Sequence, residues 1–103
     1  MRQEAGEVVH IVLFQWKEEA APGDIARAIA GLQSLKDEIP GILDLSCGEN
    51  FSARAQGYQC GLVVRFTSRA ALDAYGPHPA HQAVVQNLLA PIRAGVIAVD
   101  YEV

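Results

Sequence analysis

The segment Val8–Trp16 reads VVHIVLFQW and limits the folds open to this chain more than any other stretch. Its β-branched and aromatic residues, set between polar flanks, are typical of a β-strand. Neighbouring residues of a strand point to opposite faces, which places Val8, His10, Val12, Phe14 and Trp16 on one face and Val9, Ile11, Leu13 and Gln15 on the other. Both faces are mostly apolar, so we expect this strand to be covered on both sides.

A helix and a hairpin are predicted to follow this strand. The helix begins at Pro22, because proline suits the first helical turn, and Pro40–Gly41 ends it. Between these limits apolar residues recur at helical spacing, at Ile25, Ala28, Ile29, Leu32, Leu35 and Ile39. Residues 43–51 and 59–66 each read as a strand, and the polar loop 52–57 between them indicates a hairpin.

Two short helices and a final strand complete the predicted elements. Ser68 is a natural N-cap for a helix that carries Tyr75 and ends at Gly76–Pro77. Pro79 suits the start of the next helix, and residues 96–103 read as the last strand. The inward face of that next helix is predicted to hold His81, Val84, Val85, Leu88, Leu89 and Ile92.

This order of elements predicts an α+β fold, a ferredoxin-like four-stranded antiparallel sheet with helices on one face. Helices cover only one side of such a sheet, yet the strands 8–16 and 59–66 are apolar on both sides. Half of the 103 residues are hydrophobic, which is more than a small monomer can easily bury. We therefore expect a homodimer in which the open sheet faces meet.

Charge and hydropathy exclude several classes of partner. The net charge is −4 and the basic residues are scattered singly, so nothing indicates a nucleic-acid partner. All apolar runs are short, and the first seven residues lack the apolar block of a secretory signal. We expect a soluble cytoplasmic protein without a membrane partner.

The cysteines and histidines do not form a metal-binding pattern. Cys47 and Cys60 are the only cysteines and lack CxxC spacing, so free thiols are expected. The three histidines occur at positions 10, 78 and 81 without an HExxH motif. We expect neither a metal nor another cofactor.

The segment YGPHPAH, residues 75–81, gathers most of the proton-handling side chains of this chain. His81, three and four residues before the inward Val84 and Val85, should point toward the sheet. Partial burial and the start of a helix favour its neutral form, which a general base needs. Tyr75 is suited to donate a hydrogen bond to a carbonyl oxygen that gains negative charge. Together they are sufficient for proton abstraction next to a carbonyl and an aldol-type ring closure.

A second interpretation of this segment stays open. A tyrosine near a helix end and a histidine near a helix start are often polar-tipped core residues that satisfy backbone groups. His78, next to Pro79, is interpreted chiefly as the N-cap that orders the turn.

Three segments in this order resemble the stress-responsive α/β-barrel (Dabb) domain family: HIVLF at residues 10–14, Gly57–Tyr58, and Tyr75 with the HPAH of residues 78–81. The resemblance covers residues 8–103 and leaves residues 1–7 as a flexible N-terminal segment. It implies a ferredoxin-like dimer whose two sheets form a barrel. The family includes the plant olivetolic acid cyclase, a polyketide cyclase without a cofactor, and its catalytic tyrosine and histidine match Tyr75 and His81.

The resemblance also implies a pocket between the sheet and the helices. The candidate ligand-binding residues are His10, Val12, Phe14, Ala28, Ile29, Leu32, Cys60, Leu62, Val64, His78, Val84 and Val85. Cys60 stands where the cyclase has a further pocket histidine, and Ala28, Ile29 and Leu32 stand where it has aromatic side chains. A different substrate is therefore expected.

Three functions remain open from the sequence. The first is a dimer that binds a small carbonyl or aromatic compound, with cofactor-free cyclase or isomerase chemistry through His81 as base and Tyr75 as oxyanion donor. The second is a non-enzymatic, stress-associated structural dimer. The third, by analogy of fold alone, is a cofactor-independent monooxygenase.

Overall fold

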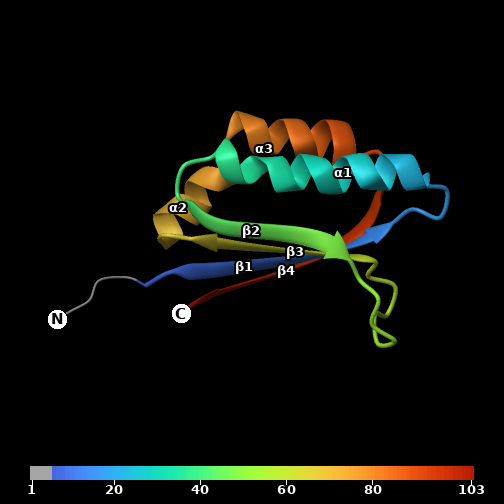
Figure 1. Ribbon diagram of the computed structural model, residues 1–103, viewed down its shortest axis with the longest axis horizontal. Coiled ribbons are helices and arrows are strands. Elements are labelled where there is room, and N and C mark those ends of the chain that lie inside the picture. Colours follow the sequence, from blue (N-terminus) through green and yellow to red (C-terminus); the bar gives the residue numbers. More distant parts are fainter. Residues whose placement is uncertain (1–5) are drawn as a thin grey trace.

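The computed structural model describes residues 6–103 and consists of a four-stranded antiparallel sheet with all helices on one face (Figure 1). This arrangement confirms the predicted α+β, ferredoxin-like sheet. The strands are β1 (Val8–Trp16), β2 (Ile42–Glu49), β3 (Cys60–Phe66) and β4 (Arg93–Glu102), in the spatial order β2-β3-β1-β4. β2 and β4 are thus the edge strands. Of the expected N-terminal segment 1–7, residues 1–5 lie outside the described residues.

The helical layer contains three α-helices, two of which are extended by a turn of another type. α1 spans Pro22–Ser34 and continues as a 3₁₀ turn, η1 (Leu35–Asp37). α2 spans Arg69–Tyr75, and α3 spans Pro79–Val84 and continues as a π-helical turn, η2 (Val85–Leu89). Pro22 and Pro79 occupy the first turns of their helices, as predicted. The side chain of Ser68 caps α2 by accepting a hydrogen bond from the backbone N–H of Ala71, at 3.1 Å.

The core lies between this helical layer and one face of the sheet. β1 and β3 alternate as predicted, and their inward residues are buried except for the partly buried His10, with Val12 paired directly to Leu62. α1 and η2 lie so close together that a Cβ on Gly31 would be only 2.5 Å from Cδ1 of Leu88. The absence of a side chain at Gly31 allows this close approach. The buried core comprises Val8, Val12, Phe14, Trp16, Ala28, Leu32, Leu35, Ile39, Cys60, Leu62, Val64, Phe66, Tyr75, Val84, Leu89 and Ile92.

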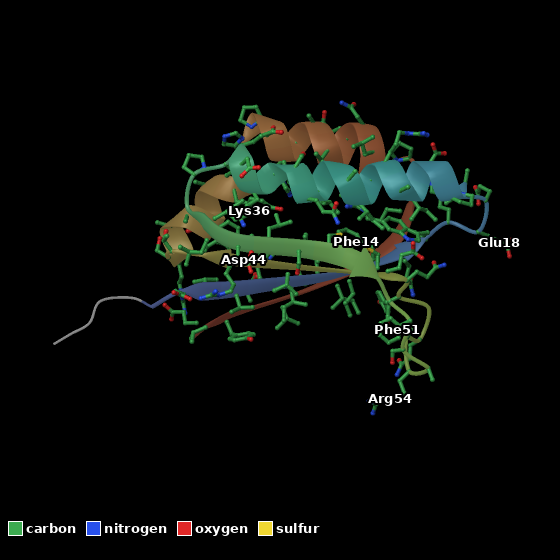
Figure 2. All side chains as sticks on the ribbon, viewed as in Figure 1. Phe14, Glu18, Lys36, Asp44, Phe51 and Arg54 are labelled. Carbon is green, nitrogen blue, oxygen red and sulfur yellow. The ribbon has the colours of Figure 1, made fainter. Side chains whose placement is uncertain are left out.

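Two strand boundaries differ from the prediction by more than one residue, each for a local reason. β2 ends at Glu49, because the Asn50 side chain donates to the carbonyl of Tyr58 and accepts from the N–H of Ser52, which turns the chain out of the sheet. β4 begins at Arg93, because β1 keeps pairing through Trp16 after an irregularity in register. The β2–β3 loop then projects beyond the sheet on the side away from the helices, and carries Phe51 and Arg54 (Figure 2).

The second face of the sheet is apolar and lacks helices. Register pairs place Ile97 opposite Leu13 and Val99 opposite Ile11 on this open face. Ile97, Val99 and Tyr101 are 44%, 50% and 50% exposed. We call this surface the open sheet face; it consists of Val9, Ile11, Leu13, Val63, Ile97, Val99 and Tyr101. Within residues 6–103, no helix has the length and apolar character needed to span a membrane.

Candidate functional site

A cavity of about 260 Å³ lies between the sheet and the helices, at the side where β4 forms the edge. Phe14 lies in this interlayer space (Figure 2). The wall is largely aliphatic and aromatic, and its polar groups are His10, Tyr75, His81 and Arg93. The full lining is His10, Val12, Phe14, Leu32, Leu62, Tyr75, His81, Val85, Leu89, Arg93, Val96 and Ala98.

Tyr75 is the last residue of α2, where helical spacing turns it inward onto β1 and β3. Its ring packs edge-on against Phe66, with centroids 5.1 Å apart, and against His10, with centroids 5.9 Å apart. The hydroxyl is buried and has no hydrogen-bond partner among residues 6–103. Burial, and to a smaller extent the nearby Cys47, raises the pKa of Tyr75 to about 12. The phenol therefore stays neutral at physiological pH, and its O–H group is free to donate a hydrogen bond.

His81 lies in the first turn of α3, beside Tyr75. Their ring centroids are 4.3 Å apart. Nδ1 of His81 is 2.9 Å from the carbonyl oxygen of Gly76, and because a carbonyl only accepts, Nδ1 must carry the proton. Burial lowers the pKa of His81, His10 and His78 add to this effect, and the hydrogen bond to Gly76 opposes it. At neutral pH the ring is uncharged, and Nε2 has a free lone pair.

His10 belongs to the same cavity and has a partner that sequence reasoning missed. Nδ1 of His10 pairs with the carboxylate of Asp100, its direct register partner on β4. A carboxylate only accepts, so Nδ1 of His10 is the donor. Strand alternation could have found this pair, because an antiparallel register between the first and last strands places Asp100 on the His10 face.

Four further lining residues, Leu89, Arg93, Val96 and Ala98, were also absent from the sequence-based set. Val96 and Ala98 share the inward face of β4, opposite Phe14 and Val12. Leu89, at the end of the π-helical turn, lies on the helix face that the sequence pattern predicted to point inward, although it was not among the predicted ligand-binding residues.

The structure divides the predicted ligand-binding residues into two groups. The cavity brings together His10, Val12, Phe14, Leu32, Leu62 and Val85 with Tyr75 and His81. The cavity lining does not include Ala28, Ile29, Cys60, Val64, His78 and Val84. Ala28, Cys60, Val64 and Val84 are buried in the core, and Ile29 packs partly buried against it. His78 caps α3 instead, because its Nδ1 accepts a hydrogen bond from the N–H of Ala80, at 3.1 Å.

A surface hollow nearby, larger than this cavity, has a different character. It measures about 340 Å³ and lies between α2 and the end of β4, where Asp100 also contributes to its wall. Arg69 in this wall is paired with Glu102 at 2.9 Å. The hollow contains neither histidine nor buried phenol, so we place the candidate site in the smaller cavity. Across residues 6–103, no three His, Cys, Asp or Glu side chains form a group that could hold a metal ion.

Comparison with known proteins gives one family and a consistent fold. The family model described as the stress responsive A/B barrel domain, Dabb, matches residues 8–103. A dimeric ferredoxin-like protein of unknown function from Jannaschia sp. CCS1 is 37% identical, with a TM-score of 0.79 over 95% of this chain and 100% of that chain. A dimeric ferredoxin-like protein of unknown function from Thermobifida fusca is 25% identical, with a TM-score of 0.85 over 100% and 96%.

A hydroxynitrile lyase from Passiflora edulis is similar in fold alone, at 19% identity and a TM-score of 0.86 over 97% of this chain and 95% of that chain. No curated protein sequence matches the chain.

Proposed function

We propose that this chain, which belongs to the stress-responsive A/B barrel (Dabb) domain family, binds a small carbonyl compound in its cavity and abstracts a proton from it. His81 is the base and Tyr75 is the oxyanion donor. The observation that carries the proposal is the buried, unpartnered hydroxyl of Tyr75 beside a histidine whose free nitrogen is Nε2.

The unpartnered hydroxyl is the strongest support for a ligand. A buried polar group without a hydrogen bond costs about 1–3 kcal/mol, so such a group calls for an explanation. A carbonyl oxygen in the cavity would accept the missing hydrogen bond from Tyr75. That bond becomes stronger as the oxygen gains negative charge, which is the condition for stabilising a transition state.

The proton-transfer sequence uses only this pair. Nε2 of His81 takes a proton from the carbon next to the carbonyl, and the electron pair of the C–H bond forms an enolate whose oxygen accepts from Tyr75. In a compound with a second carbonyl, the enolate carbon attacks that carbonyl carbon and a C–C bond forms. The resulting alkoxide takes the proton from Nε2, which restores the neutral imidazole. The sequence involves no net oxidation or reduction of the substrate.

The cavity restricts the substrate in size and polarity. About 260 Å³ is near the lower limit for small-molecule sites, so a compact compound fits best. Phe14, Leu32 and Leu62 provide apolar contact on the sheet and α1 sides. We therefore favour a short carbonyl compound with an apolar or aromatic body.

The same proposal includes a homodimer formed through the open sheet face. Its exposed aliphatic side chains form a surface that a soluble chain normally covers. Relatives from Jannaschia and Thermobifida fusca, at 37% and 25% identity, are described as dimeric. Two open sheet faces, packed together around a two-fold axis, would form the barrel that the family resemblance implied.

Deuterium exchange tests the proton abstraction itself, whatever product follows from it. Compact 1,3-dicarbonyl compounds are incubated with the protein in D₂O, and loss of the α-proton signal is followed by NMR. We expect His81→Gln to abolish the catalysed exchange and Tyr75→Phe to slow it by about 10²–10³-fold.

His78→Asn is the matched control, because His78 belongs to the same turn but does not line the cavity, and asparagine can keep the cap of α3. It should retain catalysed exchange. Wild-type exchange rates in both Tyr75→Phe and His81→Gln would refute the proposed roles. If no compound of the panel binds or exchanges its α-proton, the result supports the alternative, a non-enzymatic structural dimer.

A further inference from the structure

We propose that Cys47 and Cys60 form an oxidisable dithiol, which a hydroperoxide converts into an intramolecular disulfide between β2 and β3. This site is separate from the carbonyl cavity, whose lining includes neither cysteine.

The two cysteines are diagonal neighbours on the helix-covered side of the sheet. Cys47 pairs with Leu62, and Cys60 pairs with Glu49, so the cysteines are offset by one same-face position. Their Sγ atoms are 3.6 Å apart and share an S–H···S hydrogen bond. A disulfide bond is about 2.05 Å long, so the sulfurs must approach by about 1.5 Å.

The two cysteines differ in exposure. Cys47 is half-buried and lies on the edge strand β2. Cys60 is fully buried on the neighbouring strand β3. Cys47 therefore meets the oxidant first, and Cys60 is held beside it as the resolving thiol.

The hydrogen bond also makes one thiolate available to the pair. The S–H of Cys47 lowers the pKa of Cys60, while burial and Glu49 oppose this effect. The same hydrogen bond, with burial, raises the pKa of Cys47. The pair thus loses one proton more easily than an isolated thiol and retains the second between the two sulfurs. By these directions the thiolate lies mainly on Cys60. The minor form, with the proton on Cys60 and the thiolate on Cys47, is the one that meets the oxidant at Cys47.

The reaction balances with the hydroperoxide as the only oxidant. The Cys47 thiolate attacks the terminal oxygen of the peroxide, the O–O bond breaks, and hydroxide or alkoxide leaves while a sulfenic acid forms. The Cys60 sulfur then attacks the Cys47 sulfur, the S–O bond breaks, and hydroxide leaves. The two thiol protons convert the leaving groups to water, or to water and an alcohol. Two sulfurs are oxidised by one electron each, and the O–O bond takes up both electrons.

Peroxide titration of the reduced full chain tests this site. With hydrogen peroxide, we expect both thiols to disappear together and the intact mass to fall by two hydrogen atoms. Peptide mapping should find Cys47 linked to Cys60 within one chain, and dithiothreitol should restore both thiols. The sulfenic-acid trap dimedone should label Cys60→Ser at Cys47 while leaving the wild type nearly unlabelled.

Cys47→Ser is the matched variant, since it removes the accessible sulfur and keeps the buried one. We expect its Cys60 to lose at least ten times less thiol than the wild type in the same time. Circular dichroism checks that both variants fold, and Cys60→Ala replaces Cys60→Ser if the buried hydroxyl prevents folding. Independent oxidation of the two wild-type thiols, a disulfide between two chains, or thiols that survive peroxide would each overturn the proposal.

Discussion

The imidazole of His10 donates from Nδ1 to the carboxylate of Asp100, its direct partner across β1 and β4. This hydrogen bond fixes the tautomer and the ring orientation of His10, whose ring meets the edge of the Tyr75 ring at 5.9 Å between centroids. The cavity thus holds two imidazoles around one phenol, each with Nδ1 engaged by an acceptor. We therefore expect Asp100 to act on the proposed site through His10, as a positioning residue.

Asp100→Asn should loosen His10 without unfolding the chain. The Asp100 side chain is 46% exposed, so the pair contributes only about 0–1 kcal/mol, and ligand affinity should fall by at most about fivefold. NMR of the ring nitrogens should show a smaller fraction of the Nδ1–H tautomer at His10. Asp44→Asn is the control, because Asp44 pairs with Lys36 outside the cavity. Unchanged His10 ring signals in Asp100→Asn would contradict the positioning role.

The stability of the protein should decrease on acidification, in part through His81. Burial lowers the pKa of His81 below its ordinary value of 6.5, so below that pH the unfolded chain binds more protons than the folded chain. The contribution of neutral His81 to the free energy of unfolding is complete above pH 6.5, and it is lost as the pH falls toward the lowered pKa of His81. Urea denaturation between about pH 8 and pH 5 should show a shallower decline for His81→Gln. Parallel declines in the two proteins would disprove this assignment.

Tyr75→Phe should separate stability from function. Because the hydroxyl is buried without a partner, its removal is expected to leave the free energy of unfolding unchanged or to raise it by up to about 1 kcal/mol. Carbonyl proton exchange should nevertheless slow, since the oxyanion donor is gone. Urea denaturation of the ligand-free protein provides the measurement, and Tyr58→Phe is the control for a partly buried tyrosine outside the cavity. A loss above about 1 kcal/mol in Tyr75→Phe would indicate a structural hydrogen bond instead.

The sequence predicted the fold well because its strongest signals are local. Strand alternation in β1 and β3, together with Pro22, Ser68 and Pro79 as helix starts, specifies the elements and their inward faces. The site was harder to predict because its wall depends on pairing between distant strands. Asp100 follows from the pairing of β1 with β4, which no local signal specifies, whereas Leu89 was already on the predicted inward helix face.

Cys60 illustrates the limit of reasoning from a face alone. It has the same strand face as Leu62, and alternation therefore placed both in the pocket. The structure buries Cys60 completely, next to Cys47 and apart from the cavity lining. Which inward residue meets empty space is decided by the size and placement of the helices above it, and periodicity does not contain that information.

Ile97→Lys should convert the homodimer into a monomer. Ile97 is 44% exposed on the open sheet face, and a lysine there would bury a charge in the interface between two copies. Light scattering coupled to size-exclusion chromatography should show a mass near 11.1 kDa in place of twice that value.

The adjacent Val96 provides the matched control on the same strand. It is 48% exposed, but it points to the opposite, helix-covered side and pairs with Phe14. Val96→Lys therefore adds the same charge to the same strand without touching the open sheet face, and this variant should remain dimeric. A dimeric Ile97→Lys variant, or a wild type that is monomeric at all concentrations, would show that the open sheet face does not bind a second copy.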